Sequence, residues 1–203
     1  MAKPSWIQLD KESGSGNGSV NITAASQNTG RNARSGVLTY SAANCEDVVQ
    51  TVNQAGKSEF VTIQGTAAIG KTGGNVTLSG KSNSKKLTFS LGTGGTLNIT
   101  LPSKYTANSV ETSNGVEISG DPGATSEYDF SITIPGVAEN TSISELTKQL
   151  IVTDNGGHTA TCTLTQAAGD AYLSVSPATI ELAWDAAKGA TATVSSNTSW
   201  TVA

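Results

Sequence analysis

Short segments in which apolar and polar residues alternate with a period of two recur along the chain. The clearest are residues 20–24, 87–91, 97–101 and 130–134, with sequences VNITA, LTFSL, LNITL and FSITI. Alternation at this period places the apolar side chains on one face of a β-strand. Clusters rich in Gly, Ser, Asn and Asp separate the segments, which is typical of antiparallel β-sandwiches. Residues 142–150 and 181–189 are compatible with short helices but are too short to change an all-β class.

Composition and charge narrow the classes of partner. Hydrophobic residues make up 36% of the 203 residues and charged residues only 14%, and so low a charge content argues against a disordered chain. The net charge of −4 gives no electrostatic footprint for nucleic acid. No apolar run approaches the ~20 residues of a membrane span. We therefore expect neither nucleic acid nor a membrane as a partner.

The chain matches itself at a fixed shift. Residues 51–63, TVNQAGKSEFVTI, align with residues 163–175, TLTQAAGDAYLSV, a shift of 112 residues. Gln54 then aligns with Gln166. A match at this spacing indicates two copies of one structural unit. The chain is therefore predicted to hold one complete unit, residues 57–169, between the back half of a unit (residues 1–56) and the front half of another (residues 170–203).

The terminal segments carry the features of a known family. These are a tryptophan, a Gly/Ser-rich turn, an alternating strand, an asparagine loop, an Arg-Ser pair and a closing Gln-Ala-Gly: Trp6, residues 13–18, residues 20–24, Asn28, Arg34-Ser35 and Gln54-Ala55-Gly56. Residues 5–56 thereby resemble the second half of a BACON domain, an immunoglobulin-like sandwich. The segment YLSVSPATIELAWDAAKGATATVSSNTSWTV resembles the first half of that domain.

This resemblance implies two immunoglobulin-like β-sandwich domains, of which the first is discontinuous. Residues 1–56 plus 170–203 would form one sandwich, and residues 57–169 would be an inserted one. Eight residues would separate Trp200 from Trp6 if the two chain ends were joined, as the family's spacing requires, so these tryptophans mark the structural junction. Two arrangements remain open: the halves close within one chain, or they exchange between subunits.

No catalytic, cofactor-binding or metal-binding residues are predicted. Residues 65–72, GTAAIGKT, fit the G-x-x-x-x-G-K-[ST] phosphate-loop pattern, but two glycines and a strand follow where a helix is needed. His158, the single histidine, lies in the turn sequence DNGGH, and the carboxylates are scattered over turns. Cys162 alternates with apolar residues and is predicted to fill core space. We therefore expect a protein that is not an enzyme and needs no cofactor.

Five residues are candidates for the junction or for partner contact. Trp6 and Trp200 each begin an alternating strand, so core packing is the favoured interpretation for both. Trp184 lies beside a turn and is the better candidate for an exposed ring that stacks on a glycan. Arg31 and Arg34 form the one close arginine pair. A solvated loop is the simpler interpretation of the pair, and contact with a partner or glycan is the alternative.

The resemblance also implies a biological setting. BACON-like modules occur in secreted Bacteroidetes proteins and in virion proteins of crAss-like bacteriophages. The first residues, MAKPSWIQLD, lack the apolar segment of a signal peptide, which favours synthesis in the host cytoplasm and assembly into a virion. The expectation is an auxiliary protein on the capsid surface, bound to the major capsid protein or to neighbouring subunits, that cements these subunits or displays a weak glycan-binding surface. The alternative is an extracellular carbohydrate-binding module of a polysaccharide-degrading system.

Overall fold

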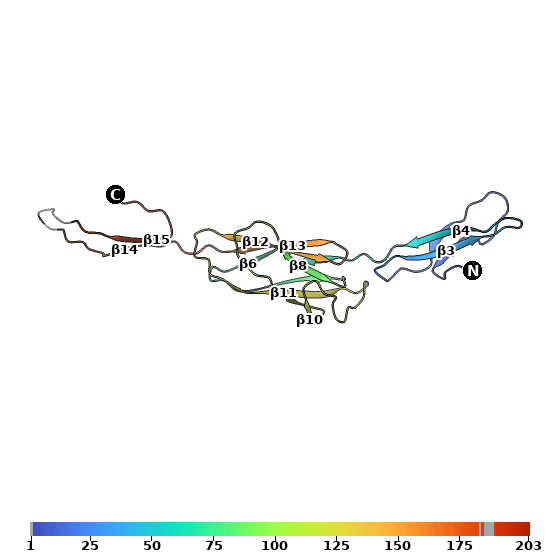
Figure 1. The fold of residues 1–203 in the computed structure, drawn as a ribbon, viewed down its shortest axis with the longest axis horizontal. Coiled ribbons are helices and arrows are strands. Elements are labelled where there is room, and N and C mark those ends of the chain that lie inside the picture. The colour runs from blue at the N-terminus through green and yellow to red at the C-terminus, as the bar shows by residue number, and fades with distance from the viewer. Residues whose placement is uncertain (1, 183, 185–188) are drawn as a thin grey trace.

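The computed structural model describes residues 2–182, 184 and 189–203, and all regular secondary structure within them is β-strand (Figure 1). The strands form three groups that lie in a row along the longest axis of the molecule. Strands β1–β4 are at one end, a sandwich of nine strands is in the middle, and the hairpin β14–β15 is at the other end. The predicted all-β class with sandwich architecture is confirmed.

The N-terminal group consists of two antiparallel hairpins. Its strands are β1 (Ile7–Leu9), β2 (Ile22–Ala24), β3 (Arg34–Tyr40) and β4 (Val48–Gln54), with β1 paired to β2 and β3 paired to β4. Ile7 and Leu38 are buried between the hairpins. Gly36 permits the close approach, because a Cβ added there would lie 2.7 Å from Pro4 Cγ and 2.9 Å from Ile7 Cδ1. This group has the beginning of a core but not a closed one.

The middle group is a complete sandwich of two sheets. The larger sheet has the order β10-β9-β11-β7-β5, and the smaller has the order β6-β13-β12-β8. All pairings are antiparallel except β6 with β13. The strands are β5 (Val61–Ile63), β6 (Thr66–Ile69), β7 (Gly74–Ser82), β8 (Leu87–Leu91), β9 (Lys104–Ala107), β10 (Val110–Ser113), β11 (Tyr128–Val137), β12 (Leu146–Asp154) and β13 (Thr159–Gln166).

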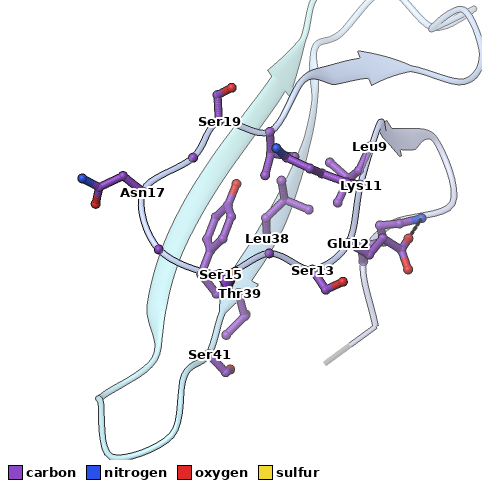
Figure 2. Close-up of a pocket in the computed structure, with 16 residues that line it drawn as sticks. Leu9, Lys11, Glu12, Ser13, Ser15, Asn17, Ser19, Leu38, Thr39 and Ser41 are labelled. Atoms are coloured by element: carbon purple, nitrogen blue, oxygen red, sulfur yellow. Dashed lines mark ion pairs between the residues drawn. The ribbon is translucent and has the colours of Figure 1, made fainter.

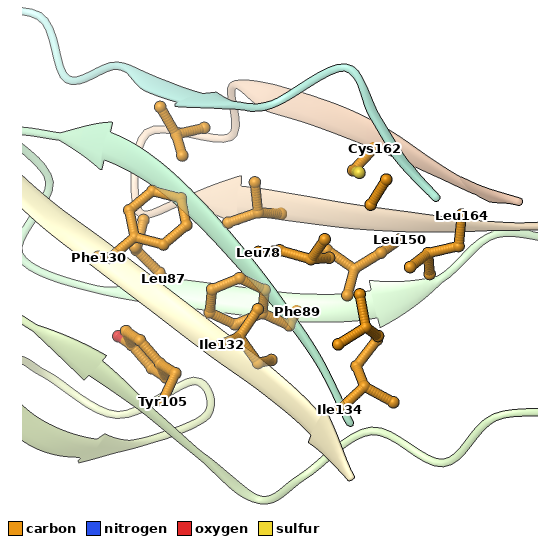
Figure 3. Packing of buried hydrophobic residues seen from close by; sticks show 14 of the residues in the cluster. Leu78, Leu87, Phe89, Tyr105, Phe130, Ile132, Ile134, Leu150, Cys162 and Leu164 are labelled. Carbon is orange, nitrogen blue, oxygen red and sulfur yellow. The ribbon is translucent and has the colours of Figure 1, made fainter. Parts of the chain in front are cut away.

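One hydrophobic core fills the space between these two sheets (Figure 3). Phe89 of β8 lies at its centre, with its ring 4.9 Å from that of Tyr105 and 5.7 Å from that of Phe130, both edge to face. Edge-to-face pairs add about 0.5–1.5 kcal/mol beyond the burial of their area. Cys162 is fully buried, as predicted, and every buried residue of the cluster lies between positions 61 and 164.

The C-terminal group is a single antiparallel hairpin. It is formed by β14 (Leu173–Ser176) and β15 (Thr193–Ser196), with Leu173 opposite Ser196. Among the described residues, neither strand pairs with a strand of the N-terminal group, and the two groups lie at opposite ends of the molecule (Figure 1). The two terminal halves are therefore not combined within this one chain. Their combination into one sandwich stays a prediction.

The alternating segments form strands where a neighbouring strand can pair with them. Residues 87–91 are β8, and residues 130–134 lie in β11, with Phe130, Ile132 and Ile134 buried as the pattern predicts. Residues 97–101 form no ladder, although Leu97 is buried, because their only backbone contact to a strand is the N–H of Leu97 to Thr147 O. Of the first segment that was compatible with a short helix, residues 142–150, residues 146–150 belong to β12. The second such segment, residues 181–189, includes residues 183 and 185–188, which lie outside the described residues.

Candidate functional site

The N-terminal hairpin β3–β4 has the same register as the hairpin β12–β13 of the middle sandwich. Arg34 lies opposite Gln54 in the first hairpin, and Leu146 lies opposite Gln166 in the second. Leu146 and Gln166 stand 112 positions after Arg34 and Gln54, which is the shift at which the sequence matches itself. The hairpin β3–β4 of the N-terminal half therefore has the strand pairing of the hairpin with which the middle sandwich ends.

The side-chain contacts beside these hairpins are repeated as well. Asn28 Nδ2 donates to Asn32 O at 2.8 Å, and Asn140 Nδ2 donates to Ser144 O at 2.8 Å. Each asparagine donates to the backbone carbonyl four residues after it and so holds the loop that precedes its hairpin. The glutamines agree too: Gln54 Nε2 donates to Ser26 O at 3.0 Å, and Gln166 Nε2 donates to Ala138 O at 2.7 Å.

The C-terminal hairpin repeats the other half of the sandwich. Asn83, which follows β7, accepts the N–H of Phe60 at 2.8 Å, and Asn197, which follows β15, accepts the N–H of Tyr172 at 3.0 Å. Their Nδ2 groups make matching bonds: Asn83 donates to Ser58 O at 3.0 Å, and Asn197 donates to Asp170 O at 2.9 Å. Residues 170–203 therefore have the local structure with which the middle sandwich begins.

Each terminal half exposes an apolar face that its counterpart buries. Tyr40 is 40% exposed, whereas Val152 at the equivalent position of β12 is fully buried. Leu173 is 59% exposed, whereas Val61 at the equivalent position of β5 is 7% exposed. Contiguous exposed apolar surface on a soluble protein marks an interaction site. These two faces are the candidate functional site.

A hollow opens beside the face of the N-terminal half (Figure 2). It encloses about 590 Å³ and lies between the Gly/Ser-rich loop 13–19 and the strands that carry Leu9 and Leu38. Tyr40 lines it as well, and Lys3 and Glu12 form an ion pair of 3.3 Å at its edge. The buried Leu38 is equivalent to Leu150, which lies in the core of the middle sandwich. The hollow is thus the open side of an unfinished core.

Arg31 fixes the N-terminal half to the end of the middle sandwich. Its Nη1 and Nη2 donate to the two carboxylate oxygens of Asp121 at 2.6 and 2.8 Å, and Nη2 also donates to Asn83 O at 2.7 Å. Arg31 Nε lies 2.7 Å from Glu59 Oε1 as an ion pair without an aligned hydrogen bond. Only 17% of the Arg31 side chain is exposed. The arginine is therefore a clamp between two units rather than a solvated loop residue.

The charges of this clamp stabilise each other. The hydrogen bond from Arg31 lowers the pKa of Asp121, although partial burial opposes the shift. The same bond raises the pKa of Arg31 above its already high value. A bidentate arginine–carboxylate pair is also directional, so it sets the orientation of the two units as well as their contact. No sequence signal points to it, because the two residues are far apart in the chain.

The C-terminal half is attached at the opposite end of the middle sandwich. Lys71 forms an ion pair with Asp170, and Asn197 Nδ2 donates to Thr141 O at 3.3 Å. Lys71 belongs to the phosphate-loop-like segment, which forms the strand β6 and a turn rather than a loop that opens a helix. The structure therefore uses this lysine at a junction and gives the motif none of the context that phosphate binding requires.

Arg34 lies on the ring of Trp6. Its guanidinium carbon is 4.7 Å from the ring centroid, and its Nε donates to Gln54 Oε1 at 2.7 Å. Trp6 is partly buried by this contact. Both predicted arginine candidates are thus engaged within the chain, Arg31 at the junction and Arg34 inside the N-terminal half.

The other two tryptophans are exposed. Trp184 has 98% of its surface accessible, and Trp200 has 49%. The core packing predicted for Trp200 is not present in the single chain. Trp6 and Trp200 are not brought together, since they belong to the groups at opposite ends (Figure 1).

The remaining candidates for chemistry have structural roles. His158 lies in the β12–β13 turn, as predicted, where its Nδ1 is 2.8 Å from Asp154 Oδ2. Within the described parts of the chain, no three His, Cys, Asp or Glu side chains gather as metal ligands would. The described part also contains no helix with the length and apolar character to cross a membrane. The contacts of His158 are thus those of a residue that holds a turn.

One family model matches the chain. Residues 1–55 match the BACON model, whose description is "Putative binding domain, N-terminal". No curated protein gives a significant match. The N-terminal part of the chain is therefore a BACON-like domain, which agrees with the resemblance found in residues 5–56. A binding domain is also compatible with the exposed apolar faces of the two terminal halves.

Proposed function

We propose that this chain is a non-enzymatic structural protein whose sandwich units bind neighbouring protein subunits. The observation that carries the proposal is the pair of apolar faces, one on each terminal half, whose counterparts in the middle sandwich are buried. Protein–protein association is the usual reason for such surface on a soluble protein. The positions of the two contacts support the proposal, because Arg31 and Lys71 lie at opposite ends of the middle sandwich and the two faces are therefore presented apart from each other.

We further propose that its setting is the surface of a bacteriophage particle, after synthesis in the host cytoplasm. There it would bind the major capsid protein or neighbouring copies and act as an auxiliary protein that cements subunits. The support is the BACON-like N-terminal domain together with the resemblance of such modules to virion proteins of crAss-like phages. A row of small sandwiches is suited to this role, because it spans several subunits while each unit keeps its own contacts.

Purified particles test this setting directly. Particles from the community that carries this gene would be banded by density, then probed by mass spectrometry and by gold-labelled antibody against residues 57–169. We expect peptides of the chain in stoichiometric proportion to the capsid protein, and gold on intact heads. Recovery of the protein only in the particle-free supernatant would contradict the virion assignment and favour an extracellular role.

A second candidate function is carbohydrate binding, and Trp184 is the observation that favours it. An aromatic ring with 98% of its surface accessible provides the flat apolar area on which a sugar ring stacks. Affinity electrophoresis through gels that contain plant or host polysaccharides would detect such binding. Retardation that Trp184→Ala abolishes and Leu182→Ala retains would support it. Equal mobility of all three proteins in every gel would exclude Trp184 as a glycan-binding residue.

A further inference from the structure

We propose that residues 170–203 of one copy complete the N-terminal half, residues 1–56, of a second copy, so that the chains join head to tail by strand exchange. The middle sandwich is the template for this contact. In it, strands β5–β8 supply one half of the fold and strands β9–β13 supply the other. The two ends of the chain carry counterparts of some of these strands in the reverse order: β3 and β4 match β12 and β13, and β14 and β15 match β5 and β7. This contact between copies does not depend on whether the protein belongs to a bacteriophage capsid.

The template fixes the register of the first new pairing. In the middle sandwich β7 pairs with β11, with Gly80 opposite Phe130. Val194 of β15 takes the place of Gly80, because Leu173 lies opposite Ser196 as Val61 lies opposite Ser82. Phe130 corresponds to Val20, because the segments FSIT and VNIT align. Strand β15 of one copy should therefore lie antiparallel to the segment that leads into β2 of the next, with Val194 opposite Val20.

The side chains at this position have changed size together. A Cβ added to Gly80 would lie 2.1 Å from the backbone oxygen of Thr62 and 2.5 Å from Phe130 Cζ, so both the neighbouring strand β5 and the large ring require a small residue there. In the terminal halves, Val194 replaces the glycine and Val20 replaces the ring. Two valines fill a similar space to a glycine and a phenylalanine, and volume-conserving exchanges are the ones that cores accept. Each terminal half alone leaves its valine partly exposed.

A second pairing closes the other side of the sandwich. In the middle unit β8 pairs with β12, with Phe89 opposite Val152. By the same alignment, Ala203 takes the place of Phe89, and Tyr40 takes the place of Val152. Residues 201–203 should therefore extend along the end of β3, beside the hollow that Tyr40 lines. This contact would cover the 40% of Tyr40 that is exposed in the single chain.

The partner is a second copy because the junctions keep a chain's own halves apart. Arg31 holds residues 1–56 at one end of the middle sandwich, and Lys71 with Asp170 holds residues 170–203 at the other (Figure 1). The surfaces that meet are different on the two copies, so the contact is heterologous, and it gives open chains unless the rotation between successive copies closes a ring. Each added copy leaves a new free face of each kind, which predicts linear oligomers.

Engineered cysteine pairs test the register. Lys81 lies opposite Asp129 in the middle unit, and the equivalent exposed positions are Ser195 and Ser19. Opposed residues on antiparallel strands have Cα atoms about 4.5–5.5 Å apart, within the range of a disulfide. Ser195→Cys combined with Ser19→Cys, in a Cys45→Ser background, should give a ladder of oligomers on non-reducing gels after mild oxidation.

A matched control and a mixing experiment make the result decisive. Thr23→Cys in place of Ser19→Cys puts the thiol on the same face of the strand but about 13 Å away, so this pair should form no ladder. Copies that carry only Ser195→Cys, mixed with copies that carry only Ser19→Cys, should give a disulfide dimer and nothing larger. Equal ladders from the matched and shifted pairs would overturn the proposal. A disulfide confined to the monomer would overturn it in favour of closure within one chain, and the absence of any disulfide would also contradict it.

Discussion

Arg31 and Asp121 form a bidentate ion pair, 2.6 and 2.8 Å long, between the N-terminal half and the middle sandwich. Asp121 lies in a loop before β11, and one of its carboxylate oxygens also accepts the N–H of Gly123 at 3.0 Å. The carboxylate is therefore held in position before the arginine binds it. An arrangement held from both sides can transmit orientation between two folded units, which a flexible linker cannot do.

Arg31→Ala should loosen this junction. The substitution leaves the carboxylate of Glu59, whose side chain is only 5% exposed, without its counter-ion. Loss of hydrogen bonds to a charged group costs about 1.5–3 kcal/mol in unfolding free energy. We expect a lower melting temperature and a broader distribution of interatomic distances in small-angle X-ray scattering. Lys81→Ala, which removes an exposed ion pair with Glu127, is the control and should change neither measurement.

The junction should also weaken in acid. Because Arg31 lowers the pKa of Asp121 in the folded protein, the pair stabilises the fold at every pH above the carboxyl's unfolded pKa of about 3.9. This contribution is lost as the pH falls through the lower folded pKa. Thermal unfolding followed between pH 7 and pH 2.5 should show the decline only below about pH 4. Asp121→Asn should flatten that part of the curve, and an unchanged acid limb in this variant would show that other carboxyl groups control it.

Asn83 and Asn197 offer a matched comparison between a buried and an exposed copy of one motif. Asn83 is 2% exposed and also donates to Ala124 O at 2.7 Å, so Asn83→Ala leaves several buried backbone groups without partners. We expect a loss of roughly 2–4 kcal/mol in the unfolding free energy of the middle sandwich. Asn197→Ala removes the same contacts from the free hairpin and should leave that unfolding transition unchanged in dilute protein. Equal effects of the two substitutions would mean that the hairpin and the sandwich unfold as one unit.

The sequence predicts those parts of the fold that depend on local patterns. Alternation over residues 130–134 identifies a strand, and the shift from Gln54 to Gln166 identifies equivalent hairpins. Both can be predicted because the period of a strand and the type of a turn depend on residues that are close together in the sequence. The ladder expected at residues 97–101 is wrong, because pairing depends on which strand lies beside the segment. The ion pairs of Arg31 cannot be predicted from the sequence either, because its partners lie in loops that are distant in the chain.

The candidate site is only partly visible in the sequence. The incomplete halves at the chain ends follow from the self-match, whereas the place of Trp184 beside a turn does not decide how far its ring is exposed. The sequence does not decide where the halves lie relative to each other. That depends on the orientation set by the Arg31 and Lys71 junctions at opposite ends of the middle sandwich.

The two cysteines should differ sharply in reactivity. Cys45 is exposed in the β3–β4 loop, whereas Cys162 is fully buried in β13, and burial raises the pKa of the Cys162 thiol. Because the thiolate is the reactive form, Cys162 should react with a thiol reagent only when the middle sandwich unfolds. In native protein at neutral pH we expect one equivalent of thiol to react rapidly, and a second to react on addition of denaturant. Rapid reaction of two equivalents of thiol in native protein would show that the core of the middle sandwich is open to the reagent.

The complementarity of the two terminal halves can be tested without any oligomer. A polypeptide in which residues 170–203 are followed directly by residues 1–56 places the halves in the order that strands β5–β13 have in the middle sandwich. Its link from β15 through Trp200 to β1 is continuous, with eight residues between Trp200 and Trp6. We expect one cooperative thermal transition, a dispersed amide NMR spectrum and quenched or blue-shifted tryptophan fluorescence, because Trp200, 49% exposed in the single chain, becomes covered. Each half expressed alone should be unfolded, since a two-hairpin or one-hairpin fragment buries too little apolar surface.

The unpermuted order, residues 1–56 followed by residues 170–203, serves as the control for composition. A rejoined chain that stays unfolded while residues 57–169 fold normally would show that the terminal halves, despite their matching registers and hydrogen bonds, do not belong to one sandwich.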